Sequence, residues 1–289
     1  MKLAYRNLIG AGLRTWLAVL VLSFSYVIII WLKSVMMGWD YQAKTEITNW
    51  EIGEGQYWHQ AYDPYDPMSL NVANASYPDE LSALFEHIDA TALLMVPGHI
   101  YPQGRMLSVV FKGIDPQQTV LKIPSALLDT IVDEIPVIVG GLMAKSARLH
   151  ARDVFAIRWR DANGTFDATD VRVVGIFSSN VPAVEQGQVY LPLQLLQQMM
   201  LLENNVTTIT LRNKPEQWTE VQGWKIKTKA MLAKQVDEMI KTKSAGQSVL
   251  YAVLLMLAML AIFDTQVLSI FRRQKEIGTY VALGYTRKQ

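Results

Sequence analysis

The sequence contains no cysteine among its 289 residues, and only 18% of the residues are charged. Without cysteine, the chain forms no disulfide and has neither a cysteine nucleophile nor a thiolate metal ligand. The charged fraction lies below the roughly one quarter that is usual in soluble domains. A net charge of +1 creates no basic field for nucleic acid, so we expect no nucleic-acid partner.

Motifs that carry chemistry are also missing from the sequence. There is no G-x-x-x-x-G-K-[ST] phosphate-binding loop and no H-E-x-x-H zinc motif. Of the four scattered histidines, we considered His59 with Asp63 and Asp66 as a metal site, but their spacing matches no recognised ligand set. We interpret this stretch as a surface loop punctuated by proline. The sequence therefore predicts no catalytic residue, no metal site and no cofactor.

The same stretch is rich in aromatic residues, and two interpretations of them stay open. They pack the loop against the core or an interface, or they form an apolar surface for a partner. The residues concerned are Trp50, Tyr57, Trp58, Tyr62 and Tyr65.

Two long apolar runs are present, and each is flanked by basic residues. The run from Thr15 to Leu32 has no charge and, extended to Met37, reaches the about 20 residues that span a bilayer. The alternative, a cleaved signal peptide, has a shorter apolar run and an A-x-A site. The second run, from Ser248 to Phe271, contains a single charge, Asp264. We interpret Asp264 as a carboxylate near the membrane interface, and a functional role is the alternative.

Basic flanks stay on the cytoplasmic side of a membrane, so the sequence places both termini in the cytoplasm. They are Lys2, Arg6 and Arg14 before the first run and Arg272, Arg273, Lys275, Arg287 and Lys288 after the second. We therefore predict a membrane protein with two transmembrane α-helices flanking an α+β extracytoplasmic (periplasmic) domain. Its parts are residues 1–40 (cytoplasmic N-terminus and first span), 41–245 (periplasmic domain), 246–271 (second span) and 272–289 (cytoplasmic segment).

Strand and helix patterns alternate within the middle segment. Ser76 and Pro78 predict a helix start before an apolar stripe at residues 81–88, and Gly140-Gly141 leads into a helix. An amphipathic helix is predicted from Lys225 to Ser244, running on into the second apolar run. The other predicted helices are Leu142–Leu149 and Pro192–Met200, and the predicted strands are Leu93–Val96, Met106–Ile114, Ile135–Val139, Val154–Arg160, Thr169–Phe177, Val189–Leu191 and Val206–Arg212.

The segment after the second run predicts a short amphipathic helix, basic at one end and terminated by Gly284. From the residues alone, it is either an anchor on anionic lipid or a helix that docks on a protein. Its pattern R-x-K-E-I-G-x-x-x-A-L-G resembles the FtsX/MacB-like family of ABC transporter permeases. The resemblance implies a coupling helix that docks in a cleft of a separate cytoplasmic ATPase, formed by Arg272, Arg273, Lys275, Glu276, Ile277, Gly278, Ala282, Leu283 and Gly284.

Further stretches resemble the same family in the same order along the chain. They include residues 111–116 (FKGIDP), 139–153, 173–177 and 189–192, and the first of these is most similar to lipoprotein-releasing, Lol-type permeases. Family members continue into two more membrane helices, so we expect this chain to be an N-terminal portion. Where the family often has asparagine, the chain has Asp264.

The resemblance implies a non-catalytic subunit of the bacterial inner membrane that transmits motion from the ATPase to the periplasmic domain. Its implied work is lipoprotein release, with export of peptides or small molecules as the alternative. The implied partners are the ATPase, a second permease copy or homologue, membrane lipids, and a lipoprotein or periplasmic protein. A protein of another class, a two-span sensor, has the same topology. The 18 residues after the second run are too few for the output domain that a sensor needs.

Overall fold

The computed structural model describes residues 13–81 and 89–284, which divide into two compact units. One unit combines the two ends of the chain, up to Asp40 and from Asp237 onward. The other is the continuous stretch Tyr41–Val236, which we call the middle unit. The sequence placed the ends of the middle segment at 41 and 245.

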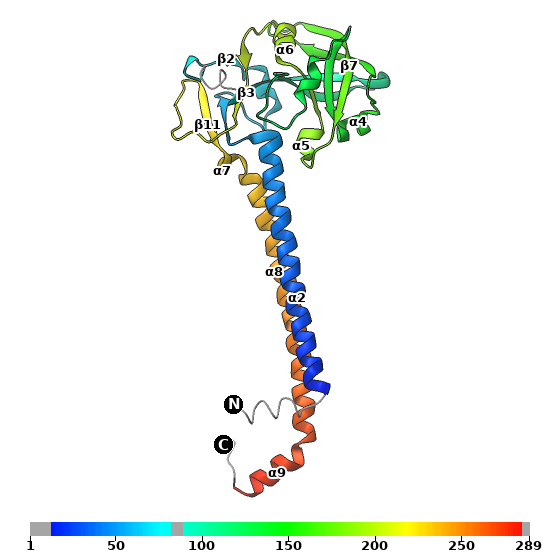
Figure 1. The fold of residues 1–289 in the computed structure, drawn as a ribbon, viewed down its shortest axis with the longest axis vertical. Helices are drawn as coiled ribbons and strands as arrows, with labels where there is room; N and C mark the ends of the chain where they lie inside the picture. The colour runs from blue at the N-terminus through cyan, green and yellow to red at the C-terminus, as the bar shows by residue number, and fades with distance from the viewer. Residues whose placement is uncertain (1–12, 82–88, 285–289) are drawn as a thin grey trace. The chain divides into compact units, whose positions relative to one another are not determined.

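The terminal unit is built of helices (Figure 1). They are most of α2 (Leu13–Ile47), most of α8 (Lys234–Arg272) and all of α9 (Gln274–Ala282); residues 41–47 of α2 and 234–236 of α8 belong to the middle unit. Among the described residues, one helical stretch, Val19–Ile52, is long and apolar enough to cross a membrane. The apolar part of α8, Ser248–Asp264, is shorter. Both predicted runs are thus helical, and their insertion in a membrane stays a prediction.

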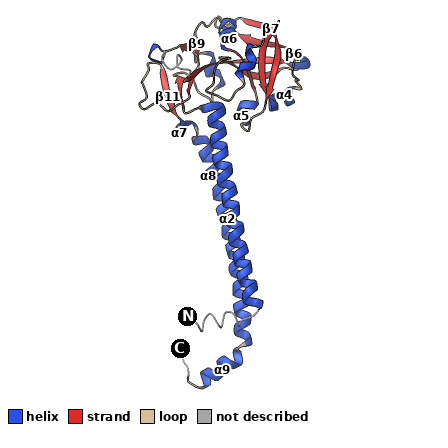
Figure 2. Ribbon diagram, viewed as in Figure 1, coloured by secondary structure: helices blue, strands red, loops and turns tan. Residues whose placement is uncertain are grey.

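All the described strands belong to the middle unit (Figure 2). Nine of them form one mixed sheet in the order β11-β1-β10-β3-β4-β8-β5-β7-β6. The strands are β1 (Gly55–His59), β3 (Ala90–Tyr101), β4 (Leu107–Ile114), β5 (Ile135–Gly140), β6 (Val154–Arg160), β7 (Phe166–Phe177), β8 (Gln188–Pro192), β10 (Thr208–Leu211) and β11 (Trp224–Thr228), and a separate pair joins β2 (Ala75–Ser76) to β9 (Asn205–Val206).

The long strand β3 joins two parts of this sheet. Its first residues, Ala90–Leu93, pair with β10, and its last, Gly98–Tyr101, pair with β6. Because β6 also pairs with β7, strands β3, β4, β8, β5, β7 and β6 close into a ring, and β10, β1 and β11 extend from it. Close approach of β6 needs a small residue, since a Cβ on Gly98 would lie 2.8 Å from the Arg158 carbonyl oxygen.

Short helices connect the strands. They are the π-helical turn η1 (Thr48–Ile52), the 3-10 turns η2 (Pro67–Asn71), η3 (Asp79–Leu81), η4 (Pro102–Gly104) and η5 (Ser125–Asp129), and the α-helices α4 (Gly141–Ala147), α5 (Pro182–Glu185), α6 (Leu193–Met200) and α7 (Lys229–Leu232). The predicted helices at 142–149 and 192–200 are confirmed by α4 and α6. The apolar stripe predicted after Ser76 lies largely at residues 82–88, outside the described residues.

The predicted strands are confirmed, with shifted ends, by β3, β4, β5, β6, β7 and β8. The strand predicted at Val206–Arg212 is interrupted at Thr207, which separates β9 from β10. The helix predicted from Lys225 is wrong at its start, because Trp224–Thr228 forms strand β11 and helix begins only at Lys229. Residues 224–227 alternate apolar and basic, and the segment 224–228 pairs with β1 as a strand.

Alternation along the strands creates two apolar clusters on opposite faces. One cluster includes Leu94, Phe111 and Leu191. The other includes their neighbours Leu93 and Tyr190, together with residues of η5 and the β7–β8 connection. Side chains of adjacent strand residues point to opposite faces, so the second cluster and the polar residues interleaved with the first share one face of the sheet.

Candidate functional site: a cavity around Lys112

Strand register places a row of side chains on this second face. Trp58 of β1 pairs with Thr208 of β10, and Thr208 pairs with Leu93 of β3. Two residues further along β3, Met95 pairs with Lys112 of β4, which in turn pairs with Tyr190 of β8. These residues form the floor of a cavity.

The cavity has a volume of about 530 Å³ and lies wholly within the middle unit. Its walls come from η1, the loop after β1, the segment after β4, and the β11–α7 segment. The lining residues are Ile47, Trp50, Glu51, Ile52, Gln56, Trp58, Tyr62, Asp63, Pro64, Tyr65, Leu93, Met95, Lys112, Leu121, Ile123, Tyr190, Thr208, Lys225, Lys227, Met231 and Leu232.

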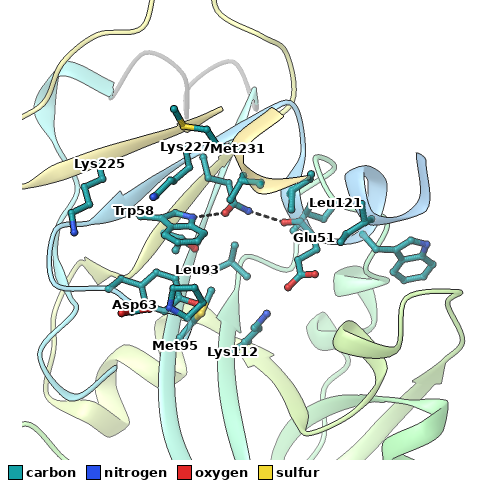
Figure 3. A pocket seen from close by; sticks show the side chains of 18 of the residues that line it. Glu51, Trp58, Asp63, Leu93, Met95, Lys112, Leu121, Lys225, Lys227 and Met231 are labelled. Atoms are coloured by element: carbon teal, nitrogen blue, oxygen red, sulfur yellow. Dashed lines mark hydrogen bonds between the residues drawn. The ribbon is translucent and has the colours of Figure 1, made fainter. Parts of the chain in front are cut away.

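Lys112 is the most unusual residue of this cavity. Its side chain is buried, with 7% exposed, and its ammonium group points into the cavity (Figure 3). Among the residues that the structure describes, no acceptor lies within hydrogen-bond or ion-pair distance of the ammonium nitrogen. Its nearest recorded contact is the Tyr190 ring, whose centroid lies 5.8 Å away. Burial lowers the pKa of Lys112, and the Glu51 carboxylate opposes this shift.

Glu51 faces Lys112 across the cavity, beyond ion-pair distance (Figure 3). A chain of hydrogen bonds holds its backbone in place. The indole N–H of Trp58 donates to Gln56 Oε1 (2.6 Å), and the Gln56 amide donates to the Glu51 carbonyl oxygen (2.8 Å) and to Thr210 Oγ1 (3.0 Å). These hydrogen bonds tie Trp58 and Gln56 to the backbone of Glu51 at one wall of the cavity.

Two tyrosines keep their protons at neutral pH in this environment. Burial, aided by the charges of Glu51 and Asp63, raises the pKa of Tyr62 to about 12. Burial, aided by Glu51, also raises the pKa of Tyr190 well above its usual value. The Tyr190 hydroxyl donates to Gln188 Oε1 (2.6 Å). Neither tyrosine adds negative charge to the cavity.

Strand β11 adds positive charge to the same face. Lys225 pairs in register with Trp58, and Lys227 pairs with Gln56. The Lys227 ammonium lies 5.1 Å from the centroid of the Trp58 ring, a cation–π arrangement. The ion pair between Lys229 Nζ and Glu54 Oε1 (2.7 Å) ties α7 to the turn before β1.

The residues predicted for ATPase coupling lie elsewhere, in the terminal unit. Arg272 ends α8, Arg273 caps α9, Leu283 follows α9, and the positions between lie in the helix: Lys275, Glu276, Ile277, Gly278 and Ala282. Gly284 adopts φ of +91°, which confirms the predicted helix-terminating glycine. Ile277, Val281 and Leu283 are exposed. The structure thus has a short helix at this place, and its coupling role stays a prediction.

The predicted surface loop is confirmed for residues 60–66, whereas its first residue, His59, ends strand β1 (Gly55–His59). Tyr57 is buried in the core, Trp50 stacks on Phe177 with ring centroids 5.6 Å apart, and Trp58 lines the cavity. His59 Nδ1 accepts from the Ala61 N–H (3.2 Å). The Asp63 and Asp66 carboxylates each accept a backbone N–H two residues ahead, so they stabilise turns.

No protein-family model and no curated protein matches the sequence. Solved structures that align with part of this chain include the periplasmic region of MacB from Actinobacillus actinomycetemcomitans, at 11% identity and a TM-score of 0.42, covering 64% of this chain and 94% of that one. Another is the extracellular domain of the noncanonic ABC-type transporter YknZ from Gram-positive bacteria, at 12% identity and a TM-score of 0.33, covering 56% and 84%. Because both TM-scores lie below 0.5, neither similarity assigns a function to this chain.

The cavity was not predicted from the sequence. Its clearest signal in the sequence is a lysine inside the mostly apolar strand of residues 107–114. Lysine is almost never fully buried unless it is paired, so Lys112 was the residue to question. Lys225 and Lys227 were not recognised as cavity residues because their segment was wrongly predicted to be helical.

Proposed function

We propose that this chain is the permease subunit of an ABC-type transporter in the bacterial inner membrane. In this proposal α2 and α8 cross the membrane, the middle unit lies in the periplasm, and both termini lie in the cytoplasm. A separate ATPase hydrolyses ATP, and this chain transmits the resulting motion without catalysing a reaction itself. A second permease copy or homologue completes the membrane part.

The observation that carries the proposal is the continuity of α8. It runs unbroken for 39 residues, from Lys234 to Arg272, and α9 begins two residues later. Only the non-helical Arg273 separates the two helices. A continuous helix is a stiff element, so displacement of α9 along the axis of α8 would reach the residues next to the middle unit.

The composition of α9 supports its role as a docking element. Ile277 and Val281 are one turn apart on the helix and are exposed, and Leu283 beside them is exposed as well. Glu276 lies in the first turn, where a carboxylate is favourable to the helix dipole. An exposed apolar stripe flanked by Arg272, Arg273 and Lys275 fits a protein cleft with an apolar floor and an acidic rim.

Within this class, we propose release of lipoproteins from the membrane as the work performed. The sequence pattern of residues 111–116 (FKGIDP), at the end of β4, favours it over export of peptides or small molecules. Retention of lipoproteins in the inner membrane when the chain is depleted would support release. Normal lipoprotein sorting with loss of peptide export would instead support the exporter.

Co-purification tests the docking of an ATPase on α9. Tagged full-length protein, extracted from its native membrane, is expected to retain an ABC ATPase that mass spectrometry identifies by its own Walker motifs. Ile277→Glu is expected to lower the retained ATPase about tenfold or more, because it places a charge in the proposed apolar contact.

Ile131→Glu is the matched control, since Ile131 is 99% exposed in the middle unit. This control is expected to retain the ATPase at the unmodified level. Equal retention by both variants, or no ATPase with the unmodified chain, would overturn the coupling role of α9. Absence of an ATPase from the unmodified chain would favour the alternative function, a two-span extracytoplasmic sensor.

A further inference from the structure

The cavity around Lys112 presents an unmet positive charge. The Lys112 residue is only 7% exposed, its ammonium group points into the cavity, and the described residues place no acceptor within reach of it. Buried cations in proteins are normally paired, because desolvation of an unpaired charge is costly. We therefore expect the hydrogen-bond acceptor for the Lys112 ammonium group to come from a bound molecule.

The charges that face the cavity favour an anion. Lys112, Lys225 and Lys227 are the basic side chains of its lining, and Glu51 and Asp63 are the acidic ones. Glu51 faces Lys112 but remains beyond ion-pair distance, so it leaves the ammonium group available. A carboxylate or phosphate group would accept a charge-assisted hydrogen bond from Lys112.

Part of the remaining wall is apolar, and a small hydrated anion would leave that part uncovered. Leu93, Met95, Leu121 and Ile123 line one part of the cavity, and Met231 and Leu232 line another. The volume of about 530 Å³ lies within the about 300–1,000 Å³ typical of ligand pockets. An apolar chain attached to the anionic group would cover these surfaces.

We propose that this cavity binds a single-headed anionic amphiphile, such as a fatty-acid carboxylate or a monoalkyl phosphate. Lys112 binds its anionic group, and the apolar chain lies against Leu93, Met95 and Leu121. The occupant touches both chain connections of the middle unit, since Ile47 ends α2 and α7 precedes α8.

Photocrosslinking of the full-length chain in lipid nanodiscs tests this assignment. The probes are a diazirine-bearing long-chain fatty acid and the primary alcohol of the same chain. Digestion with a protease that does not cleave at lysine keeps peptides of all variants comparable. The fatty acid is expected to label peptides that contain Leu93–Met95 and Leu121–Ile123 about tenfold more than the alcohol does, because only the carboxylate pairs with Lys112.

Lys112→Met is expected to abolish this preference for the carboxylate, while the alcohol labels as before. Lys145→Met, at an exposed lysine of α4, is expected to keep the preference. Equal labelling by both probes in the unmodified chain, an unchanged preference in Lys112→Met, or labels confined to α2 and α8 would overturn the proposal. The experiment involves neither an ATPase nor α9, so its failure leaves the proposed function untouched.

Discussion

Replacing Gly140 by alanine is expected to destabilise the middle unit by about 3 kcal/mol or more, because the added methyl group meets fixed backbone. The Cβ would lie 2.3 Å from Glu185 Cα and 2.5 Å from the Glu185 carbonyl oxygen. Glu185 cannot easily move away. Its buried carboxylate accepts from the Leu142 N–H (3.1 Å) at the start of α4 and from the Ser179 N–H.

The neighbouring glycine provides a matched control. At Gly141 the nearest atoms to an added Cβ lie 3.5 Å away, which is ordinary van der Waals contact. Gly141 is the first residue of α4, where alanine is the better helix former, so Gly141→Ala is expected to be neutral or stabilising by up to about 1 kcal/mol. Thermal unfolding of both variants, followed by tryptophan fluorescence, measures the difference. Similar melting temperatures would contradict the close approach of α5 to β5.

Replacing Lys112 by methionine is expected to stabilise the unliganded protein at neutral pH, by on the order of 1–3 kcal/mol. Methionine retains most of the volume and apolar contacts of the lysine side chain and removes a buried charge that lacks an acceptor. Such a gain in stability would indicate that Lys112 is kept at this position for a function and not for folding stability. Thermal unfolding at pH 7 measures it, with Lys145→Met as the exposed control.

The advantage of Lys112→Met is also expected to depend on pH. Burial lowers the pKa of Lys112 in the folded protein, so between this pKa and the usual value near 10.5 the unfolded chain binds more protons than the folded one. Unfolding free energy of the unmodified protein therefore rises with pH across this window. The difference between the two proteins should narrow as the pH approaches about 10. A difference that stays constant or widens would contradict a protonated, desolvated Lys112.

Much of the middle unit could be predicted because its strands alternate or form short buried runs between turn residues. The hairpin of β6 and β7 is an example, since residues 161–164 supply its turn. The order in which the strands pair in the sheet could not be predicted from the sequence. The contact of β3 with both β10 and β6 joins residues far apart in the chain, and no local pattern encodes it.

The cavity could not be predicted either, because it also depends on the pairing of strands that are distant in the sequence. Lys112, Trp58 and Thr208 share a face only because β4, β3, β10 and β1 are neighbours in the sheet. Residues 224–228 were predicted as helix, since a five-residue alternation next to a long amphipathic pattern is a weak signal. Helix α9 was predictable because its stripe, its basic start and its final glycine are local features.

Single-cysteine labelling tests the proposed orientation of the chain in a membrane most directly. The sequence has no cysteine, so Ala162→Cys at the exposed turn between β6 and β7, and Gln274→Cys at the start of α9, introduce one thiol each. In intact spheroplasts, a membrane-impermeant maleimide is expected to label position 162 fully and position 274 only after detergent is added. Labelling of position 274 from outside, or protection of position 162, would contradict a periplasmic middle unit and cytoplasmic termini.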